Sequence, residues 1–216
     1  MHYPIFKSIV NKIDDTLALR NINVKNFKTW SEPKINATGL SIIIDLSSST
    51  HHLDTLSIHF DWDRFREAAC ARQMEGTSHH PVLKTKTFGK TSVDPFIDVE
   101  MNWSFDVEQC QPSSSNGDAD FRIRTASEWM EKASRKVNEI LADDDIITRW
   151  HLEIDGDKEG KYLTSINLIS YYQFSLAGLE SLQEVHRFTR RKLIHLLQQA
   201  KQVVRIVDQT VEVKAA

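Results

Sequence analysis

The chain has 216 residues, of which 40% are hydrophobic and 26% are charged, and its formal net charge is −3. This length and composition are typical of a folded globular protein with a substantial core, built as one large domain or two small ones. The nearly neutral charge argues against nucleic acid as a partner, because neutralisation of phosphates by Lys and Arg supplies much of the affinity in such complexes.

The sequence carries no pattern typical of secretion or membrane insertion. The N-terminal segment lacks a charged start followed by an apolar run, and no stretch approaches the roughly 18 apolar residues that a membrane span needs. Cys70 and Cys110 match no metal or redox spacing, so we expect free thiols in a reducing compartment. We therefore expect a cytoplasmic protein without membrane contact and without a cofactor.

The first elements expected along the chain are a helix, a loop and a strand. An apolar residue recurs at every fourth position from Ile5 to Leu17, which predicts a helix over 4–20. Residues 21–38 are mixed in character and predict a loop, with room for a short strand. The β-branched run over 40–46 predicts a strand.

The next part of the chain predicts a strand, a short helix and another strand. Residues 55–62 alternate between apolar and polar side chains, as in a strand with one buried face. Asp63 is placed to cap a helix that runs to about Glu75. Residues 81–88 predict a further strand. The inward side chains expected on the short helix are Phe65, Ala69 and Met74.

The middle of the chain contains the clearest strand pattern, over 96–107, where apolar and polar residues alternate throughout. A stretch at about 109–120 is rich in Ser, Asn, Gly and Asp and predicts a mobile loop. Residues 121–124 predict a brief strand, and 126–141 predict a helix with one apolar side.

The last third predicts a hairpin followed by a long helix. Residues 147–155 alternate, two glycines bracket a turn, and 163–176 form a second strand. The apolar and aromatic content of 163–176 indicates cover on both faces over part of its length. A long amphipathic helix over 179–207 ends the series.

The two sides of this long helix differ sharply. At about 100° per residue, one stripe is apolar and the opposite side is basic. The apolar stripe consists of Leu182, Val185, Thr189, Leu193, Leu196, Ala200, Val203 and Val207. The opposite side carries Arg187, Arg190, Arg191, Ile194, Gln198, Lys201 and Arg205.

Together these elements predict one α+β domain over 1–216. Regular β-α-β alternation is missing, which favours a mostly antiparallel sheet with helices packed on one face, including the long C-terminal amphipathic helix. Aromatic side chains bring large buried areas to a sheet–helix interface. Core positions are therefore expected for Trp30, Trp62, Trp103, Trp129 and Trp150.

The leading hypothesis for function is a non-enzymatic binding or accessory protein that acts through protein–protein contacts. Ile194 stands alone among basic residues, which indicates a contact surface facing an acidic protein or a second copy of this chain. The plainer interpretation is a solvated helix face, with Glu180 and Glu184 balancing the charge at its start. Nucleophile motifs and phosphate-binding loops are missing. The partner-binding residues are expected to be Arg187, Arg190, Arg191, Ile194, Lys201 and Arg205.

The first alternative is a metal-dependent phosphoester hydrolase on the polar face of the sheet. Period-two spacing places imidazole and carboxylate groups on one face of each of three strands, and neighbouring strands in register would bring them together. The candidate ligands are His59, Asp61, Glu100, His151 and Glu153. The plainer interpretation is the water-facing side of an amphipathic sheet.

The second alternative is a binding site for an apolar small molecule between the sheet and the long helix. A curved sheet covered by a helix can enclose an apolar cavity. The residues expected to line it are Trp103, Trp150, Tyr172 and Phe174.

Overall fold

The computed structural model describes residues 3–46, 53–75, 95–105, 119–140, 147–155 and 162–212, with side chains left out at 119–126, 140, 147–155, 162–164 and 211–212. Four helices and six strands lie within these ranges. The helices are α1 (Pro4–Leu19), α2 (Arg64–Met74), α3 (Ala119–Ile140) and α4 (Leu182–Glu212). The strands are β1 (Val24–Glu32), β2 (Ala37–Asp45), β3 (Leu53–Asp63), β4 (Phe96–Phe105), β5 (Ile147–Asp155) and β6 (Tyr162–Ser175).

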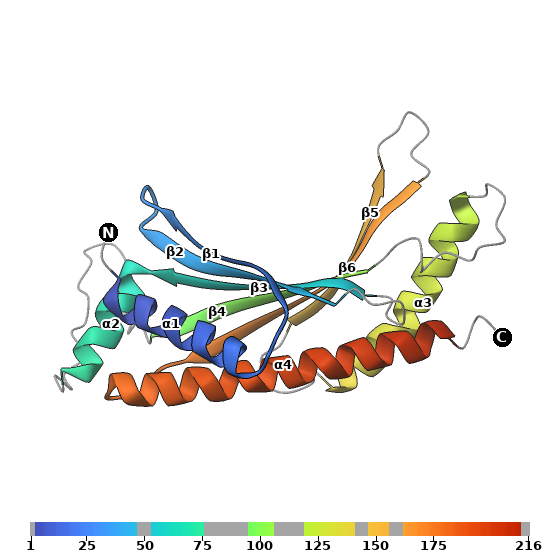
Figure 1. The fold of residues 1–216 in the computed structure, drawn as a ribbon. Helices are drawn as coiled ribbons and strands as arrows, with labels where there is room; N and C mark the ends of the chain where they lie inside the picture. Colours follow the sequence, from blue (N-terminus) through green and yellow to red (C-terminus); the bar gives the residue numbers. More distant parts are fainter. Residues whose placement is uncertain are drawn as a thin grey trace.

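All six strands form one antiparallel sheet in the order β1-β2-β3-β4-β6-β5. In β4 and over 56–62 of β3 every second side chain is buried, which follows directly from the alternating sequence. Figure 1 shows α1 and α4 on the same side of this sheet, with α3 crossing near the C-terminal end of α4. The expected α+β class with a long C-terminal helix is therefore confirmed.

The core lies between the sheet and the helices. From the sheet it takes fully buried side chains such as Leu40, Ile58 and Trp103, and from α4 it takes Val185 and Leu196. At one end, the rings of Phe105 in β4 and Trp129 in α3 meet edge to face, with centroids 5.1 Å apart. The sheet and the three long helices thus share one continuous apolar layer.

A buried carboxylate joins α1 to α2. Glu67 of α2 is 8% exposed, and its two oxygens accept hydrogen bonds from the backbone N–H groups of Ile5, at 2.7 Å, and Phe6, at 3.1 Å. The indole N–H of Trp62 donates a third, at 2.8 Å. A carboxylate at a helix N-terminus satisfies free N–H groups and complements the helix dipole, so Glu67 caps α1 from a distance.

The short helix α2 begins as the sequence predicts, and Met74 packs against the core as expected, but Phe65 does not. The Asp63 carboxylate accepts a hydrogen bond from the backbone N–H of Arg66, as a helix N-cap. The expectation that Phe65 points inward is wrong, because its side chain is 60% exposed. Glu67 and Cys70 are the buried residues instead, and burial, with Glu67 close by, raises the pKa of the Cys70 thiol to about 12.

Two segments adopt a different structure from the one expected. Residues 24–32 form the nine-residue edge strand β1, whereas the sequence predicts a loop with room for only a short strand. Exposure along an edge removes the alternation that identifies a strand. The strand predicted at 121–124 is wrong, since α3 already begins at Ala119. Four alternating residues are too few to distinguish a strand from the first turns of a helix.

Three further predictions concern the burial of β6 and the structure of two segments, 81–88 and about 109–120. β6 buries one face only over its described side chains, and Tyr171 on the other face is 39% exposed. The strand predicted at 81–88 lies outside the described residues. So does the loop predicted at about 109–120, apart from Ala119 and Asp120, which belong to α3.

Trp30 differs from the other tryptophans whose side chains are described. It pairs with Gly39 across β1 and β2, and its ring occupies the space where a side chain at Gly39 would lie. Because Leu40 and Ile42 of β2 are buried on the core side, alternation places Gly39 and the Trp30 ring on the opposite face. The expectation that Trp30 fills the core is therefore wrong.

Candidate functional site

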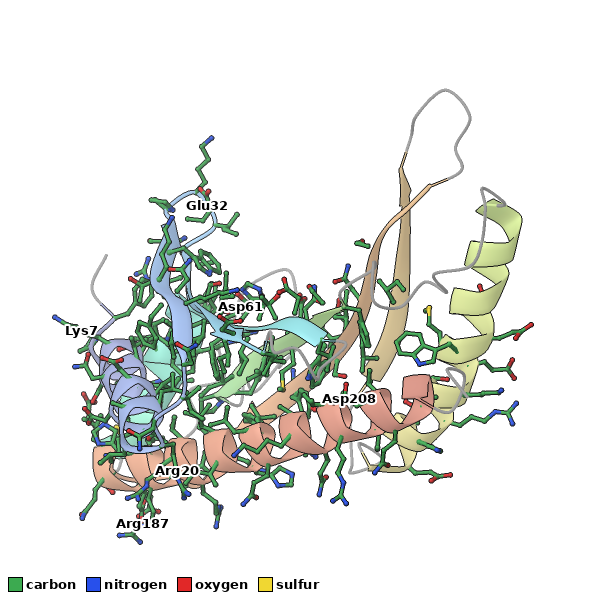
Figure 2. The ribbon with its side chains drawn as sticks, turned by 45° about the vertical axis from the view of Figure 1, so that its right-hand side comes forward. Lys7, Arg20, Glu32, Asp61, Arg187 and Asp208 are labelled. Carbon is green, nitrogen blue, oxygen red and sulfur yellow. The ribbon has the colours of Figure 1, made fainter. Side chains whose placement is uncertain are left out.

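The outward side of α4 carries a continuous basic surface. Its side chains face away from the core, as Figure 2 shows for Arg187, which projects from α4 on the side opposite the sheet. The five cations are exposed and Ile194 is half-buried. We call this surface the basic face, and its members are Arg187, Arg190, Arg191, Ile194, Lys201 and Arg205.

The apolar stripe of the same helix fixes this orientation. Seven of its eight expected members are buried, the exception being Leu182 at the first turn, which is 39% exposed. Because these side chains are buried against the sheet and α1, the residues half a turn away on the helix point toward solvent. At the N-terminal part of the helix, Ser8 of α1 hydrogen-bonds to His186 across 2.6 Å and fixes the contact between α1 and α4.

Acidic residues of α4 flank the basic face at its two ends. Glu184 lies three positions before Arg187. Asp208 lies three positions after Arg205. None of the five cations takes part in an ion pair within the described ranges. Arg187 and Arg191 are four residues apart, as are Lys201 and Arg205, and like charges at this spacing repel one another by a few tenths of a kcal/mol. The positive charge of the basic face is therefore not neutralised by any ion pair within the described part of the chain.

Lys192 belongs to a different environment on the same helix. Its ammonium group lies 5.1 Å from the ring centroid of Phe174 and 5.7 Å from that of Phe188. These contacts direct its charge onto aromatic rings at the junction of α4 and β6. Arg191 also lies near a ring, with its guanidinium 5.7 Å from the Phe188 centroid, but its side chain is exposed whereas that of Lys192 is half-buried. Lys192 is therefore not counted in the basic face.

A shallow, open depression of about 500 Å³ lies on the basic face. Its lining residues are Arg187, Arg190, Arg191, Ile194, His195 and Gln198. Four of these are predicted partner-binding residues, while Lys201 and Arg205 lie one to three turns further along α4. The sequence places His195 and Gln198 on the polar side of the helix but gives no signal that they line a depression.

The candidate metal ligands are brought together only in part. His59 lies directly opposite Glu100, and Asp61 directly opposite Asp98, on the adjacent strands β3 and β4. Among the described residues, no group of three or more His, Cys, Asp or Glu side chains is arranged to hold a metal ion. Figure 2 shows Asp61 on the far side of the sheet from α4.

His151 and Glu153 lie elsewhere on the sheet. Both belong to β5, and β6 separates that strand from β4. His151 pairs with Asn167, which pairs in turn with Ser104, four positions along β4 from Glu100. The register therefore keeps these two residues away from His59 and Glu100.

Arg66 of α2 pairs with acidic residues at the end of β3 and near the start of β4. Its guanidinium lies 2.5 Å from a carboxylate oxygen of Asp98 and 3.3 Å from one of Asp63, and it stacks 4.2 Å from the ring centroid of Phe96. Burial and the facing Asp98 raise the pKa of Asp61, against the smaller opposing effects of Arg66 and His59. Arg66 thus pairs with two of these carboxylates, while Asp61 has a like charge opposite it on β4.

The residues expected to line an apolar pocket are packed in the core. Trp103 and Tyr172 are buried on neighbouring strands, but Trp103 pairs with Leu168, four positions from Tyr172. Phe174 packs against Tyr172 and Phe188, with ring centroids 6.1 and 6.5 Å apart. Burial raises the pKa of the Tyr172 hydroxyl.

Trp150 is the fourth residue expected to line an apolar pocket. It lies on β5, of which the structure describes only the backbone. The remaining three belong to the core cluster, Trp103 from β4 and Tyr172 and Phe174 from β6. The basic face is therefore the strongest candidate site on the described surface.

No helix in the described ranges is both long and apolar enough to cross a membrane.

Comparisons with known proteins identify no relative of this chain. Neither the known protein families, nor characterised proteins, nor solved structures give a match to this chain.

Proposed function

We propose that this chain is a non-enzymatic binding protein that captures an acidic protein partner on the basic face of α4. The observation that carries the proposal is a row of exposed cations around Ile194 that form no ion pair in the described part of the chain. Charge of this kind steers an oppositely charged partner and fixes its register.

The charge of α4 contrasts with that of the whole chain. α4 contains six Lys and Arg residues against three Asp and Glu residues, whereas the full chain has a net charge of −3. The positive charge is therefore local. A local basic surface on an otherwise acidic protein favours a partner with a matching acidic patch over a long polyanion.

The proposal is tested by reversing two charges of the basic face, in the variant Arg187→Glu/Arg191→Glu. Because both side chains are exposed, we expect the fold to remain intact while capture of the partner from a cell lysate falls by at least tenfold. Capture is measured on the immobilised chain by quantitative mass spectrometry, at 0.15 M salt and again at 0.5 M, where screening should weaken it.

A matched control makes the same charge change on another helix. Lys132 and Lys136 are exposed on α3, also four residues apart, and Lys132→Glu/Lys136→Glu should leave capture unchanged. Circular dichroism and thermal unfolding establish that both double variants are folded. Equal capture by the wild type and the α4 variant would refute the proposed function.

A further inference from the structure

We infer that the basic face recognises a short acidic segment in extended form with one apolar side chain near its centre. This inference rests on the proposed function and specifies which part of the partner is bound. Three features of α4 lead to it: the order of charges along the helix, their chemistry, and the position of Ile194.

The charges lie on both sides of Ile194 along the helix axis. Arg187, Arg190 and Arg191 precede it, and Lys201 and Arg205 follow it. At 1.5 Å of rise per residue the row from Arg187 to Arg205 is about 27 Å long. An extended chain rises about 3.3 Å per residue, so about eight or nine residues would cover the row.

The arginines favour carboxylate-bearing side chains. A guanidinium presents its N–H donors as a planar fork that matches a carboxylate, and three of them border the depression. Repulsion between Arg187 and its neighbours one turn away is relieved when acidic groups approach. A single exposed ion pair contributes about 1 kcal/mol or less, so several acidic residues are needed in one segment.

Ile194 supplies the apolar part of the surface. It lines the depression, whereas Phe188, Val204 and Ile206 are the half-buried apolar residues of α4 that pack against the core. The aliphatic stems of neighbouring arginines extend this apolar area. An aliphatic side chain placed over Ile194 would lose contact with water on one side, which favours a segment with acidic residues on both sides of one apolar residue.

The inference is tested with synthetic peptides whose binding is measured by fluorescence anisotropy. The first probe is a nine-residue peptide with Leu at the centre and Glu at the other eight positions. The second has Ser in place of the central Leu, and the third has Gln in place of every Glu. We expect the wild-type chain to bind the first probe at least fivefold more tightly than the second, and the third not at all.

Two variants assign these preferences to residues. Ile194→Ser should bind the Leu-centred and Ser-centred peptides equally, because the apolar contact is gone while the charges remain. Arg187→Glu/Arg191→Glu should lose at least tenfold in affinity for both. Lys132→Glu/Lys136→Glu serves as the control that should bind as the wild type does.

Several outcomes would overturn the inference. Equal binding of the first two peptides to the wild type would remove the role of Ile194, and tighter binding of a twelve-nucleotide single-stranded DNA would assign the basic face to nucleic acid. If no peptide binds while capture from lysate still requires Arg187 and Arg191, the inference fails and the proposed function stands. If capture itself is unaffected by charge reversal, the proposed function fails as well.

Discussion

At the scale of single residues, Glu67 is the most consequential side chain outside the basic face. One buried carboxylate accepts hydrogen bonds from two backbone N–H groups of α1 and from the Trp62 indole. A buried donor that loses its acceptor costs more than the hydrogen bond itself contributes, because the donor stays desolvated. The attachment of α1 therefore depends on a residue more than 60 positions away in the sequence.

The variant Glu67→Gln tests this role. The amide keeps the size of the side chain but replaces one acceptor oxygen with an N–H₂ group that faces the donors. We expect a loss of about 1–3 kcal/mol in the free energy of unfolding, measured by urea denaturation. Glu75→Gln makes the same change at an exposed position next to α2 and should stay within about 0.5 kcal/mol of the wild type.

At the scale of elements, the contact between β1 and β2 depends on a missing side chain. A Cβ atom at Gly39 would lie 2.4 Å from the Trp30 ring, far inside normal contact. The ring can lie flat on the sheet only because position 39 has no side chain. Trp30 in turn shields the backbone of β2 at that point, where Gly39 is buried.

We therefore expect Gly39→Ala to displace the Trp30 ring and to lower the free energy of unfolding by about 1–3 kcal/mol, as overpacking does. In a Trp30→Ala background the same substitution should cost close to nothing, because the obstructing ring is gone. A double-mutant cycle by urea denaturation measures this difference. Ser41→Ala, two residues along the same face, is the control; a cost for Gly39→Ala independent of Trp30 would contradict the packing described.

Elements marked by a local pattern could be predicted from the sequence, whereas features decided by exposure at an edge or by distant contacts could not. The apolar stripe of α4 and the alternation in β3 and β4 are local patterns, and the structure confirms them. β1 lies at an edge, where burial does not enforce alternation, so its sequence resembles a loop. The place of Phe65 was missed because the contact of Glu67 with α1, which is formed by distant residues, decides which face of α2 is buried.

At the scale of the whole molecule, the orientation of α4 decides both stability and the candidate site. The side of the helix that covers the sheet includes Leu196, which is fully buried, while Ile194 lies on the opposite side. Each turn of α4 thus contributes to the core and to the basic face at once. Sequence reasoning could assign both sides of this helix because its periodicity is long and regular, whereas the order of the strands leaves no such local trace.

Two substitutions by alanine compare the contributions of the buried and the outward side of α4 to stability. Leu196→Ala should lower the free energy of unfolding by about 2–5 kcal/mol, as expected for a cavity in a packed core. Ile194→Ala should cost about 1 kcal/mol or less, since it removes little core contact. Urea denaturation of both variants provides the comparison, and similar costs would mean that α4 is rotated from the orientation described here.

The order in which these elements leave the ribosome follows from the place of α4 in the chain. All six strands are synthesised before the helix that covers their apolar side. Until α4 is synthesised, the buried side chains that it contributes to the core, such as Val185 and Leu196, are missing from the apolar side of the sheet. Between completion of the sheet and synthesis of α4 the nascent chain therefore exposes part of the apolar face of its sheet, and transiently exposed apolar surface of this kind promotes aggregation.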